Sequence, residues 1–444
     1  MHDFLFFRAP SPLSTALLVL SLSSACADSK APVASDESPA EGNPDAGETN
    51  PLASGGKVHD ASLDAGSPRR TSDAGSPDGG HKSEPTGSSL DASADASSAV
   101  VDAGITLRPF PTNGEVLKAP DKKWTYIEFP DTQCRDGSKA GIAVSLESSS
   151  KKLMIFLEGG GACFDPISCL ANPANTSGMQ AEQTAGIWDR SNSQNPVRDW
   201  NFVYVPYCTG DTHAGAKPDG MVAGVGPQKF VGYLNMQKFL NRIVPTFKDA
   251  TDVLLTGISA GGFGAAQNAV LVQRAFSNVK VRAVDDSGPP LSKDAIAPCL
   301  QDKWRTTWGL DQSYLDDCGA DCPKKDDFAQ DYGLFLAKTF ADRSSGLIES
   351  AQDSIISGFF GAGLNNCTGV VLLTPVPGDV FQKDLLAFRE KVKPYSSFST
   401  YIPSGTQHTW LSNPTFYTGT AGGTKLVDWF TKIVNNEVPG HVGP

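Results

Sequence analysis

Residues 255–264, with the sequence LTGISAGGFG, constrain the fold more than any other part of the chain. The short apolar run 252–255 precedes them, as a buried strand would, and residues 265–274 have the composition of a helix. A strand, a Gly-x-Ser-x-Gly turn and a helix describe a nucleophile elbow, in which the glycines allow a sharp turn that exposes the serine. The pattern predicts that Ser259 is a nucleophile. A glycine-rich turn with an incidental serine is the alternative.

Composition divides the chain into three parts. Between 27 and 104 there is no aromatic residue and no cysteine, and Ser, Ala, Asp, Gly and Pro dominate. Such a segment cannot bury enough apolar surface to offset chain entropy, so we expect a disordered tether over 26–106. Residues 107–444 contain aromatics throughout and suit one large globular domain. The net charge of -12 comes with no basic cluster, which argues against a nucleic-acid partner.

Residues 1–25 resemble an export signal. Their apolar run, 13–22, is too short to span a bilayer as a stable helix. Small residues precede Cys26, as in a bacterial lipobox, although Ser23 stands where a Leu is usual. We predict cleavage before Cys26, lipidation of its sulfur and location in a bacterial cell envelope, with ordinary secretion as the alternative.

The cysteines support export. There are nine, and setting Cys26 aside leaves eight in the globular part, an even number that predicts disulfides in an exported protein. Zinc binding by the closely spaced pair at 318 and 322 is the alternative, but no histidine and no second close pair lies near it to complete four ligands. The predicted pairs are Cys163–Cys169, Cys318–Cys322, Cys134–Cys208 and Cys299–Cys367.

A second glycine-rich turn follows a buried strand predicted at 152–157. It contains Gly159, Gly160 and Gly161. Glycines let backbone N–H groups approach a substrate oxygen and stabilise its developing negative charge, as in the oxyanion loops of serine hydrolases. A phosphate-binding loop would end in Lys followed by Ser or Thr, which is absent here. A purely structural turn remains an alternative.

The remaining elements indicate an α/β fold. Because the predicted strands alternate with helices, we expect a mostly parallel sheet flanked by helices, with catalytic loops at its carboxyl edge. A helical cap is expected over 290–345. Further strands are predicted at 124–129, 140–146, 200–208, 280–284, 345–350 and 398–403, and a C-terminal helix at 426–435.

A serine nucleophile needs an adjacent base, and histidine is scarce in this chain. Only His213, His408 and His441 lie in the globular part. His408 follows a late strand in a glycine-containing loop, where this fold delivers its base. We expect His441, near the C-terminus, to be mobile, and His213 to line the pocket or to lie at the surface.

The acid that would orient the histidine is less certain from local pattern. Asp353 follows the predicted strand 345–350, and Asp379 follows a strongly apolar run. Asp285 and Asp286 end another predicted strand. The residues alone leave these candidates open, with Asp353 only slightly ahead.

Five motifs occur in an order that resembles the pectin acetylesterase/Notum family over most of 120–430. They are LEGGGAC at 157–163, PYC at 206–208, GISAGG at 257–262, DSG at 286–288 and SAQD at 350–353. The resemblance implies an α/β-hydrolase-like fold without metal or cofactor. It also implies a triad of Ser259, Asp353 and His408, and an oxyanion hole made by the backbone N–H groups of Gly160, Gly161 and Ala260.

The chain departs from the family pattern at two positions that line the substrate pocket. Gly161 and His213 stand where the family often has aromatic residues. We expect His213, Asp211 and Tyr207 to bind substrate. The resemblance therefore implies the catalytic residues more firmly than the substrate.

These observations predict an exported, monomeric serine carboxylesterase whose partner is an esterified polysaccharide or another acyl ester. By resemblance, the expected substrate is an acetyl ester on a polysaccharide such as pectin. One alternative is a longer acyl ester on a lipid or protein, as Notum-like members cleave. Another is a non-catalytic, carbohydrate-binding surface lipoprotein.

Overall fold

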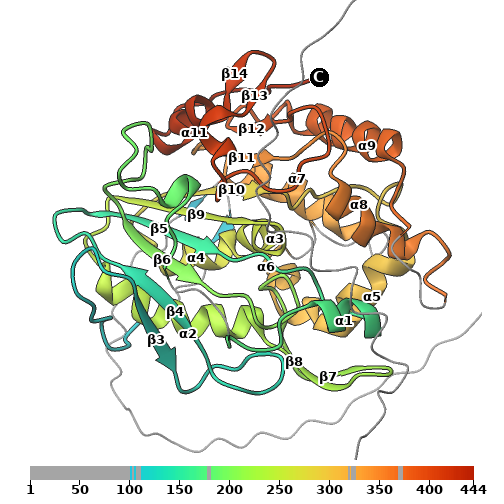
Figure 1. The fold of residues 1–444 in the computed structure, drawn as a ribbon, viewed down its shortest axis with the longest axis horizontal. Helices are drawn as coiled ribbons and strands as arrows, with labels where there is room; N and C mark the ends of the chain where they lie inside the picture. The colour runs from blue at the N-terminus through green and yellow to red at the C-terminus, as the bar shows by residue number, and fades with distance from the viewer. Residues whose placement is uncertain are drawn as a thin grey trace, which may run out of the picture. The chain divides into compact units, whose positions relative to one another are not determined.

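The computed structural model describes residues 112–177, 182–318, 321, 327–368 and 374–444, and the backbone of 101–102 and 105–106. Its centre is an eight-stranded sheet of order β12-β11-β10-β9-β5-β6-β4-β3 (Figure 1). The strands are β3 (Thr125–Phe129), β4 (Ala140–Ser145), β5 (Lys152–Leu157), β6 (Asn201–Val205), β9 (Asp252–Ile258), β10 (Val281–Asp286), β11 (Ser345–Ile348) and β12 (Phe398–Tyr401).

The six strands from β12 to β6 are parallel, whereas β4 and β3 pair in antiparallel fashion at one edge. This confirms the predicted mostly parallel sheet. Because the six strands run the same way, the loops that follow them meet at one edge. The chain segments after β5, β9, β11 and β12 carry the glycine loop and the three residues predicted to form a triad.

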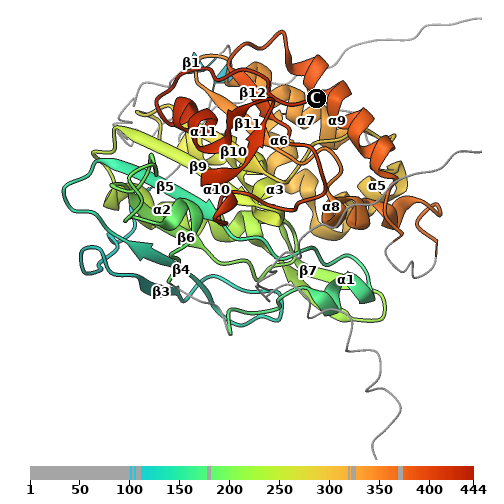
Figure 2. The same ribbon diagram turned by 45° about the horizontal axis from the view of Figure 1, so that its top comes forward.

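Both faces of the sheet are buried, which the alternation of side chains along β5 shows. Leu153, Ile155 and Leu157 pack into one apolar core, and Met154 and Phe156 pack into the other. Figure 2 shows helices in front of and behind the sheet. The first core is covered by α1 (Pro166–Ala171), α2 (Gly232–Thr246), α3 (Ala260–Gln267), α4 (Ala269–Ala275), α5 (Pro298–Trp308), α6 (Tyr314–Cys318), α7 (Phe328–Thr339), α8 (Ser354–Phe360) and α9 (Gly378–Val392), and the second by η1 (Gly186–Trp188), α10 (Thr415–Thr418) and α11 (Leu426–Val434).

The helix after the elbow is divided, where the sequence predicts one continuous helix. Asn268 lies between α3 and α4, and its side-chain amide donates hydrogen bonds to the carbonyls of Gly264 and His213. An asparagine that bonds nearby carbonyls in this way competes with regular helix geometry. The division connects the elbow helix to the loop that contains His213.

The described residues between 290 and 344 contain α5, η2 (Leu310–Gln312), α6 and α7, the helices of the predicted cap. Between β6 and α2 there is also a hairpin of β7 (Lys217–Val222) and β8 (Gly226–Phe230). The other short elements are β1 (Val101–Asp102), β2 (Ile105–Thr106), β13 (Thr420–Ala421), β14 (Thr424–Lys425) and η4 (Gly361–Gly363).

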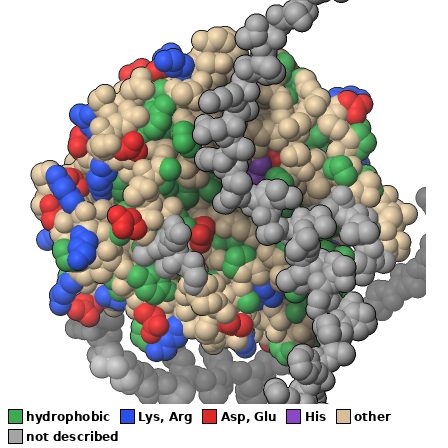
Figure 3. Space-filling model, viewed as in Figure 1, with side chains coloured by type: hydrophobic (Ala, Val, Ile, Leu, Met, Phe, Trp, Pro, Cys, Tyr) green, Lys and Arg blue, Asp and Glu red, His purple; other side chains and the backbone are tan. Residues whose placement is uncertain are grey.

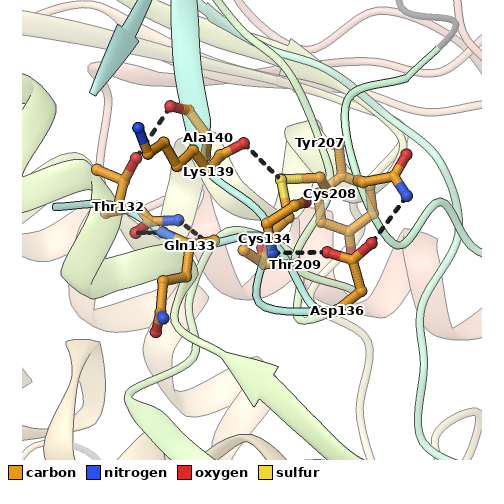
Figure 4. The surroundings of a disulfide bond; sticks show 12 residues. Thr132, Gln133, Cys134, Asp136, Lys139, Ala140, Tyr207, Cys208 and Thr209 are labelled. Atoms are coloured by element: carbon orange, nitrogen blue, oxygen red, sulfur yellow. Dashed lines mark hydrogen bonds between the residues drawn. A yellow bond between two sulfur atoms is a disulfide. The ribbon is translucent and has the colours of Figure 1, made fainter. Parts of the chain in front are cut away.

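Three of the four predicted disulfides are present, namely Cys134–Cys208, Cys163–Cys169 and Cys299–Cys367. Figure 4 shows Cys208, which follows β6, bonded to Cys134 beside Tyr207 and Thr209. Cys318 is also disulfide-bonded, and Cys322, its predicted partner, lies outside the described residues. Disulfides of this kind fit an exported protein.

The C-terminal histidine is held in place, so the expectation that it is mobile is wrong. Val442 extends the edge of the sheet through backbone hydrogen bonds with Thr400 and Ile402. The His441 ring nitrogen Nδ1 lies 3.1 Å from the Thr400 hydroxyl. His441 is therefore a structural residue of the edge strand.

Across the part of the chain that the structure describes, no helix has the length and apolar character needed to cross a bilayer. Lys and Arg side chains are interspersed with Asp and Glu on the face in Figure 3. The leader at 1–25, the tether at 26–106 and Cys26 lie outside the described side chains, so the predicted domain boundaries and lipidation stay predictions.

Candidate active site

Ser259 lies at a sharp turn between β9 and α3, as the elbow pattern predicts. Its φ of 56° and ψ of -122° are an unusual, strained conformation for a residue with a side chain. A hydrogen bond of 2.8 Å from Ser259 N to Asp286 O holds the turn against β10. A Cβ atom on Gly261 would overlap the Leu157 carbonyl, and one on Gly257 would lie 2.6 Å from it. Both positions therefore require glycine.

His408 is paired with Asp353, which joins the loop after β12 to the loop after β11. The His408 Nδ1 atom lies 2.7 Å from Asp353 Oδ2. Asp353 is fully buried, whereas the His408 side chain is 18% exposed. A carboxylate only accepts hydrogen bonds, so Nδ1 carries the proton and Nε2 of the neutral ring is left as an acceptor.

Asp353 has a second task, as the N-cap of α8. Its Oδ1 atom accepts hydrogen bonds from the N–H groups of Ile355 and Ile356, at 2.8 and 2.9 Å. These bonds satisfy free donors at the start of the helix. The helix terminus therefore fixes the carboxylate while its other oxygen holds His408.

The loop that carries His408 is anchored by Asp286, a residue that pattern alone left as a candidate acid. Asp286 Oδ2 accepts hydrogen bonds from the N–H groups of Trp410 and Leu411, at 2.8 and 2.7 Å. The Ser287 hydroxyl accepts another from Thr409 N. Burial raises the pKa of Asp286 to about 6. Because its backbone carbonyl also bonds Ser259 N, this residue links the nucleophile loop to the histidine loop.

The predicted oxyanion groups lie on the two loops next to the nucleophile. Gly161 and Ala260 line the same cavity as Ser259, whereas Gly160 packs against the ring of Tyr207. Among the described residues, no hydrogen bond uses the N–H groups of Gly160, Gly161 or Ala260. Free backbone donors beside a nucleophile are what a developing oxyanion requires.

Ser259 opens onto an apolar cavity between the sheet and the helical cap. Its volume is about 110 Å³. From Ser259 it extends along β10 and β11 toward the amino ends of the strands, past Ala283 and Ser345. Its walls are mostly aromatic and aliphatic, with Trp304, Trp308, Tyr332, Leu336, Phe360 and Phe398 among them. These lining residues carried no functional prediction, because an apolar residue that lines a cavity has the same local pattern as one that fills a core.

The three residues predicted to bind substrate from the 207–213 loop do not line this cavity. Tyr207, Asp211 and His213 are all buried, with exposed fractions of 2%, 0% and 3%. The Tyr207 hydroxyl accepts a hydrogen bond from Thr212 N, and Asp211 accepts from the Thr209 hydroxyl and Gly232 N. Their polar atoms are thus occupied within the protein.

His213 is held behind the glycine loop. Its Nε2 atom donates a 2.8 Å hydrogen bond to the carbonyl of Glu158, and its ring stacks obliquely on Tyr207. Burial lowers the pKa of His213 to about 4 and raises that of Asp211 to about 6. In this position His213 supports the backbone that leads into the glycine loop.

Two further carboxyl groups lie buried close to the site. Glu349 lies fully buried beside Asp353, and the Oδ1 atom of Asp285 has no hydrogen-bond partner in the described part of the chain. Burial, followed by the charge of Asp353, raises the pKa of Glu349 well above its ordinary value. Asp379, the other candidate acid, instead occupies the first turn of α9. Sequence reasoning gave Glu349 no role.

The described residues contain no group of three His, Cys, Asp or Glu side chains placed to hold a metal ion. The geometry is that of a serine, an oriented histidine and a carboxylate on adjacent loops, beside free N–H donors and an apolar cavity. Such an arrangement suits attack by a hydroxyl on an ester carbonyl.

Comparison with known proteins finds similar proteins by sequence and by structure. Residues 120–316 match the family model described as Pectinacetylesterase. The chain is 32% identical over 186 residues to a palmitoleoyl-protein carboxylesterase, notum2, of Xenopus laevis, which covers 38% of this chain and 37% of that protein. It is 29% identical over 184 residues to notum1a of Danio rerio, again a palmitoleoyl-protein carboxylesterase, covering 38% and 36%. The alignments thus span little more than a third of the relatives' length.

The fold agrees over a longer stretch. The chain aligns with the solved structure of the Wnt deacylase Notum from Drosophila with a TM-score of 0.55 and 21% sequence identity. The alignment covers 71% of this chain and 94% of the Notum chain. That likeness shows an α/β-hydrolase-like fold. The sequence matches and the shared fold thus make the chain similar to the pectinacetylesterase/Notum family.

Proposed function

We propose that the protein is a serine carboxylesterase with Ser259 as nucleophile, His408 as base and Asp353 as the acid that orients it. The observation that carries the proposal is the strained Ser259 elbow at the mouth of an apolar cavity, on the same sheet edge as the 2.7 Å His408–Asp353 pair. The names of the relatives, which are carboxylesterases, support the reaction class.

In this mechanism the Ser259 hydroxyl attacks the ester carbonyl carbon, and His408 Nε2 accepts its proton. Asp353 stabilises the imidazolium that forms. The N–H groups of Gly161 and Ala260 donate hydrogen bonds to the oxyanion, and the N–H of Gly160, in the same loop as Gly161, is the third predicted donor. His408 then returns the proton to the leaving alcohol, and a water molecule, deprotonated by His408, releases the acyl group from Ser259 as a carboxylic acid.

The cavity supports an acyl group longer than acetyl. A single bound water needs about 10–15 Å³ of cavity on this measure, so there is room for roughly seven or more water-sized groups. The lining along β10 runs from Asp285 to Ala283, two residues of strand, or about 7 Å at roughly 3.3 Å each. An acetyl group would place only one methyl in this space.

The acetyl ester on a polysaccharide, which the sequence favours, is the second candidate. The match of 120–316 to the Pectinacetylesterase model supports it. The two candidates differ in what occupies the cavity, because a polysaccharide would lie outside it and a long acyl chain within it. Chain-length preference therefore distinguishes them.

Purified full-length protein should hydrolyse 4-nitrophenyl octanoate with a higher kcat/KM than 4-nitrophenyl acetate. Ser259→Ala should abolish both activities, and Ser277→Ala, at an exposed serine after α4, should abolish neither. Comparable activity in the Ser259→Ala protein contradicts the mechanism. A preference for acetate would instead favour the acetyl substrate and leave the mechanism intact.

We further propose that the protein is exported and anchored by lipid on Cys26. Disulfides in the folded domain support export. Mass spectrometry of the mature N-terminus should find an acylated Cys26. An unmodified N-terminus elsewhere would reject the anchor and leave secretion.

A further inference from the structure

One carboxyl group stands out in the apolar cavity beside Ser259. Asp285 lines this cavity and is 7% exposed. It belongs to β10, a strand with neighbours on both sides, and alternation puts Ala283 and Asp285 on the cavity face. Asp286, the next residue, points to the other face and holds the His408 loop.

One oxygen of the Asp285 carboxyl has no hydrogen-bond partner, although the neighbouring backbone leaves space for the group. Its Oδ1 atom is buried and has no hydrogen-bond partner among the residues that the structure describes. A Cβ atom on Gly288 would lie 2.6 Å from this oxygen, and one on Gly262 would overlap it. Both flanking residues are glycines, so the carboxyl fits between two stretches of backbone, where the N–H of Gly288 partly offsets the effect of burial on its pKa.

Other polar side chains in the cavity wall are satisfied by one another. The Thr212 hydroxyl donates to Gln267 Oε1 at 2.8 Å, and the Gln267 amide donates to the Tyr314 hydroxyl at 3.4 Å. The Tyr332 hydroxyl donates to the Gln267 carbonyl at 3.4 Å. Asp285 takes no part in this network. An unsatisfied polar group in a buried wall is costly, and a bound ligand with a matching group removes that cost.

The position of Asp285 says where such a ligand group would lie. Asp285 pairs in register with Gly257 of β9, which is two residues before Ser259. At roughly 3.3 Å per residue, Asp285 therefore lies about 7 Å from the level of Ser259 along the strand direction. The carboxyl therefore faces the part of an acyl chain within a few carbons of the ester. Burial, followed by the charge of Asp286, raises the pKa of Asp285 well above its ordinary value. A protonated carboxyl both donates and accepts a hydrogen bond, as a hydroxyl partner requires.

We infer that Asp285 is a specificity residue that selects acyl groups with a hydroxyl near the carbonyl, so that the preferred substrates are hydroxyacyl esters. This inference rests on the proposed esterase function. It deepens that function, because a wholly apolar cavity would accept a plain alkyl chain and would discriminate against a hydroxylated one.

The test compares 4-nitrophenyl octanoate with the two enantiomers of its 3-hydroxy analogue on the full-length enzyme. We expect kcat/KM for one hydroxy enantiomer to exceed that for octanoate by about tenfold or more. Asp285→Leu should invert this ratio, and Asp285→Asn, which keeps a donor and an acceptor, should retain part of it. Ser345→Ala, at the far end of the same wall, should leave the ratio unchanged.

A binding measurement keeps the inference separate from the reaction. The Ser259→Ala protein should bind one enantiomer of 3-hydroxyoctanoate about tenfold more tightly than octanoate in a calorimetric titration, and the double variant with Asp285→Leu should not. Equal ratios in wild type and Asp285→Leu, or equal binding of the two acids, overturn the inference while octanoate hydrolysis still supports the esterase. Without hydrolysis of any ester, the esterase proposal fails and the titration alone decides on Asp285. If Asp285→Leu does not fold, the wild-type and Asp285→Asn ratios decide it.

Discussion

Two histidine loops at the same edge of the sheet differ in what surrounds the ring. His408 follows β12, keeps 18% of its side chain exposed and donates a hydrogen bond from Nδ1 to the buried Asp353 carboxylate. His213 follows β6, is 3% exposed and donates a hydrogen bond from Nε2 to the Glu158 carbonyl. The His408 ring is thus held by a charged group and remains partly accessible, whereas the His213 ring is buried.

The difference separates a general base from a structural histidine. A neighbouring carboxylate stabilises the imidazolium that a base must become, whereas burial against a neutral carbonyl opposes protonation. The lowered pKa of His213, about 4, has burial as its largest cause. The same residue type thus supports chemistry in one loop and backbone geometry in the other.

The most severe test of this comparison replaces each ring in turn. His408→Ala should lower kcat by about 10⁵–10⁶-fold, because the nucleophile and its base act as a unit. His213→Ala should lower the free energy of unfolding by about 2–4 kcal/mol and lower kcat of the folded fraction less than about tenfold. His441→Ala serves as the control, since its ring lies on the edge strand. A larger kcat loss for His213→Ala than for His408→Ala would contradict the assignment of His408 as the base.

The next test concerns the carboxylate that distinguishes the two loops. Asp353→Asn keeps the shape of the N-cap but removes the charge that orients His408, and should lower kcat by about 10⁴-fold. Asp379→Asn, at the other aspartate that sequence pattern proposed, should change kcat less than about twofold, because Asp379 lies in the first turn of α9. Ester hydrolysis at pH 7.5 measures both. Equal effects of the two changes would contradict the assignment of Asp353.

The cavity offers a test of intermediate size, because neither histidine lines it, although Thr212, next to His213, does. Ala329 lines it from α7 of the cap and is only partly buried. Ala329→Trp should lower kcat/KM for 4-nitrophenyl octanoate by about 10–100-fold and change that for the acetate less than about threefold. Ala329→Ser, with little added volume, is the control. An equal loss on both esters would show that the acyl chain does not occupy this space.

The smallest expected effect concerns Glu349, the buried carboxyl beside Asp353. Its folded-state pKa is raised, so its stabilising contribution is complete below the unfolded pKa and is lost as pH rises through the folded pKa. Removing this acid as Glu349→Gln should therefore flatten the decline in Tm from pH 5 to pH 8 and add about 1–3 kcal/mol of stability at pH 8. Glu437→Gln, at an exposed position, should leave the decline as it is in wild type. A steeper decline in Glu349→Gln would contradict burial as the cause.

Much of the fold followed from local pattern because strands and turns depend on neighbours in sequence. The elbow at Ser259, the buried strand before Gly159 and the histidine that follows β12 were all predictable. Helix α2 carried no prediction, although its buried residues Tyr233, Met236 and Leu240 recur at helical spacing. The division of α3 and α4 at Asn268 depends on a contact with the distant His213 loop, which no local pattern contains.

By itself, the sequence determined the nucleophile turn, the glycine loop, three of the disulfide pairs and the order of elements that brings Ser259, Asp353 and His408 to one sheet edge. Only the tertiary structure decided that Asp286 anchors the histidine loop and that His213 is buried. It also decided that an apolar cavity, with one carboxyl oxygen of Asp285 left without a partner, lies beside Ser259. The physical reason is that a turn is set by the conformations open to a few adjacent residues. Burial, cavity shape and hydrogen-bond satisfaction depend on groups more than a hundred residues apart, such as Asp286 and Trp410.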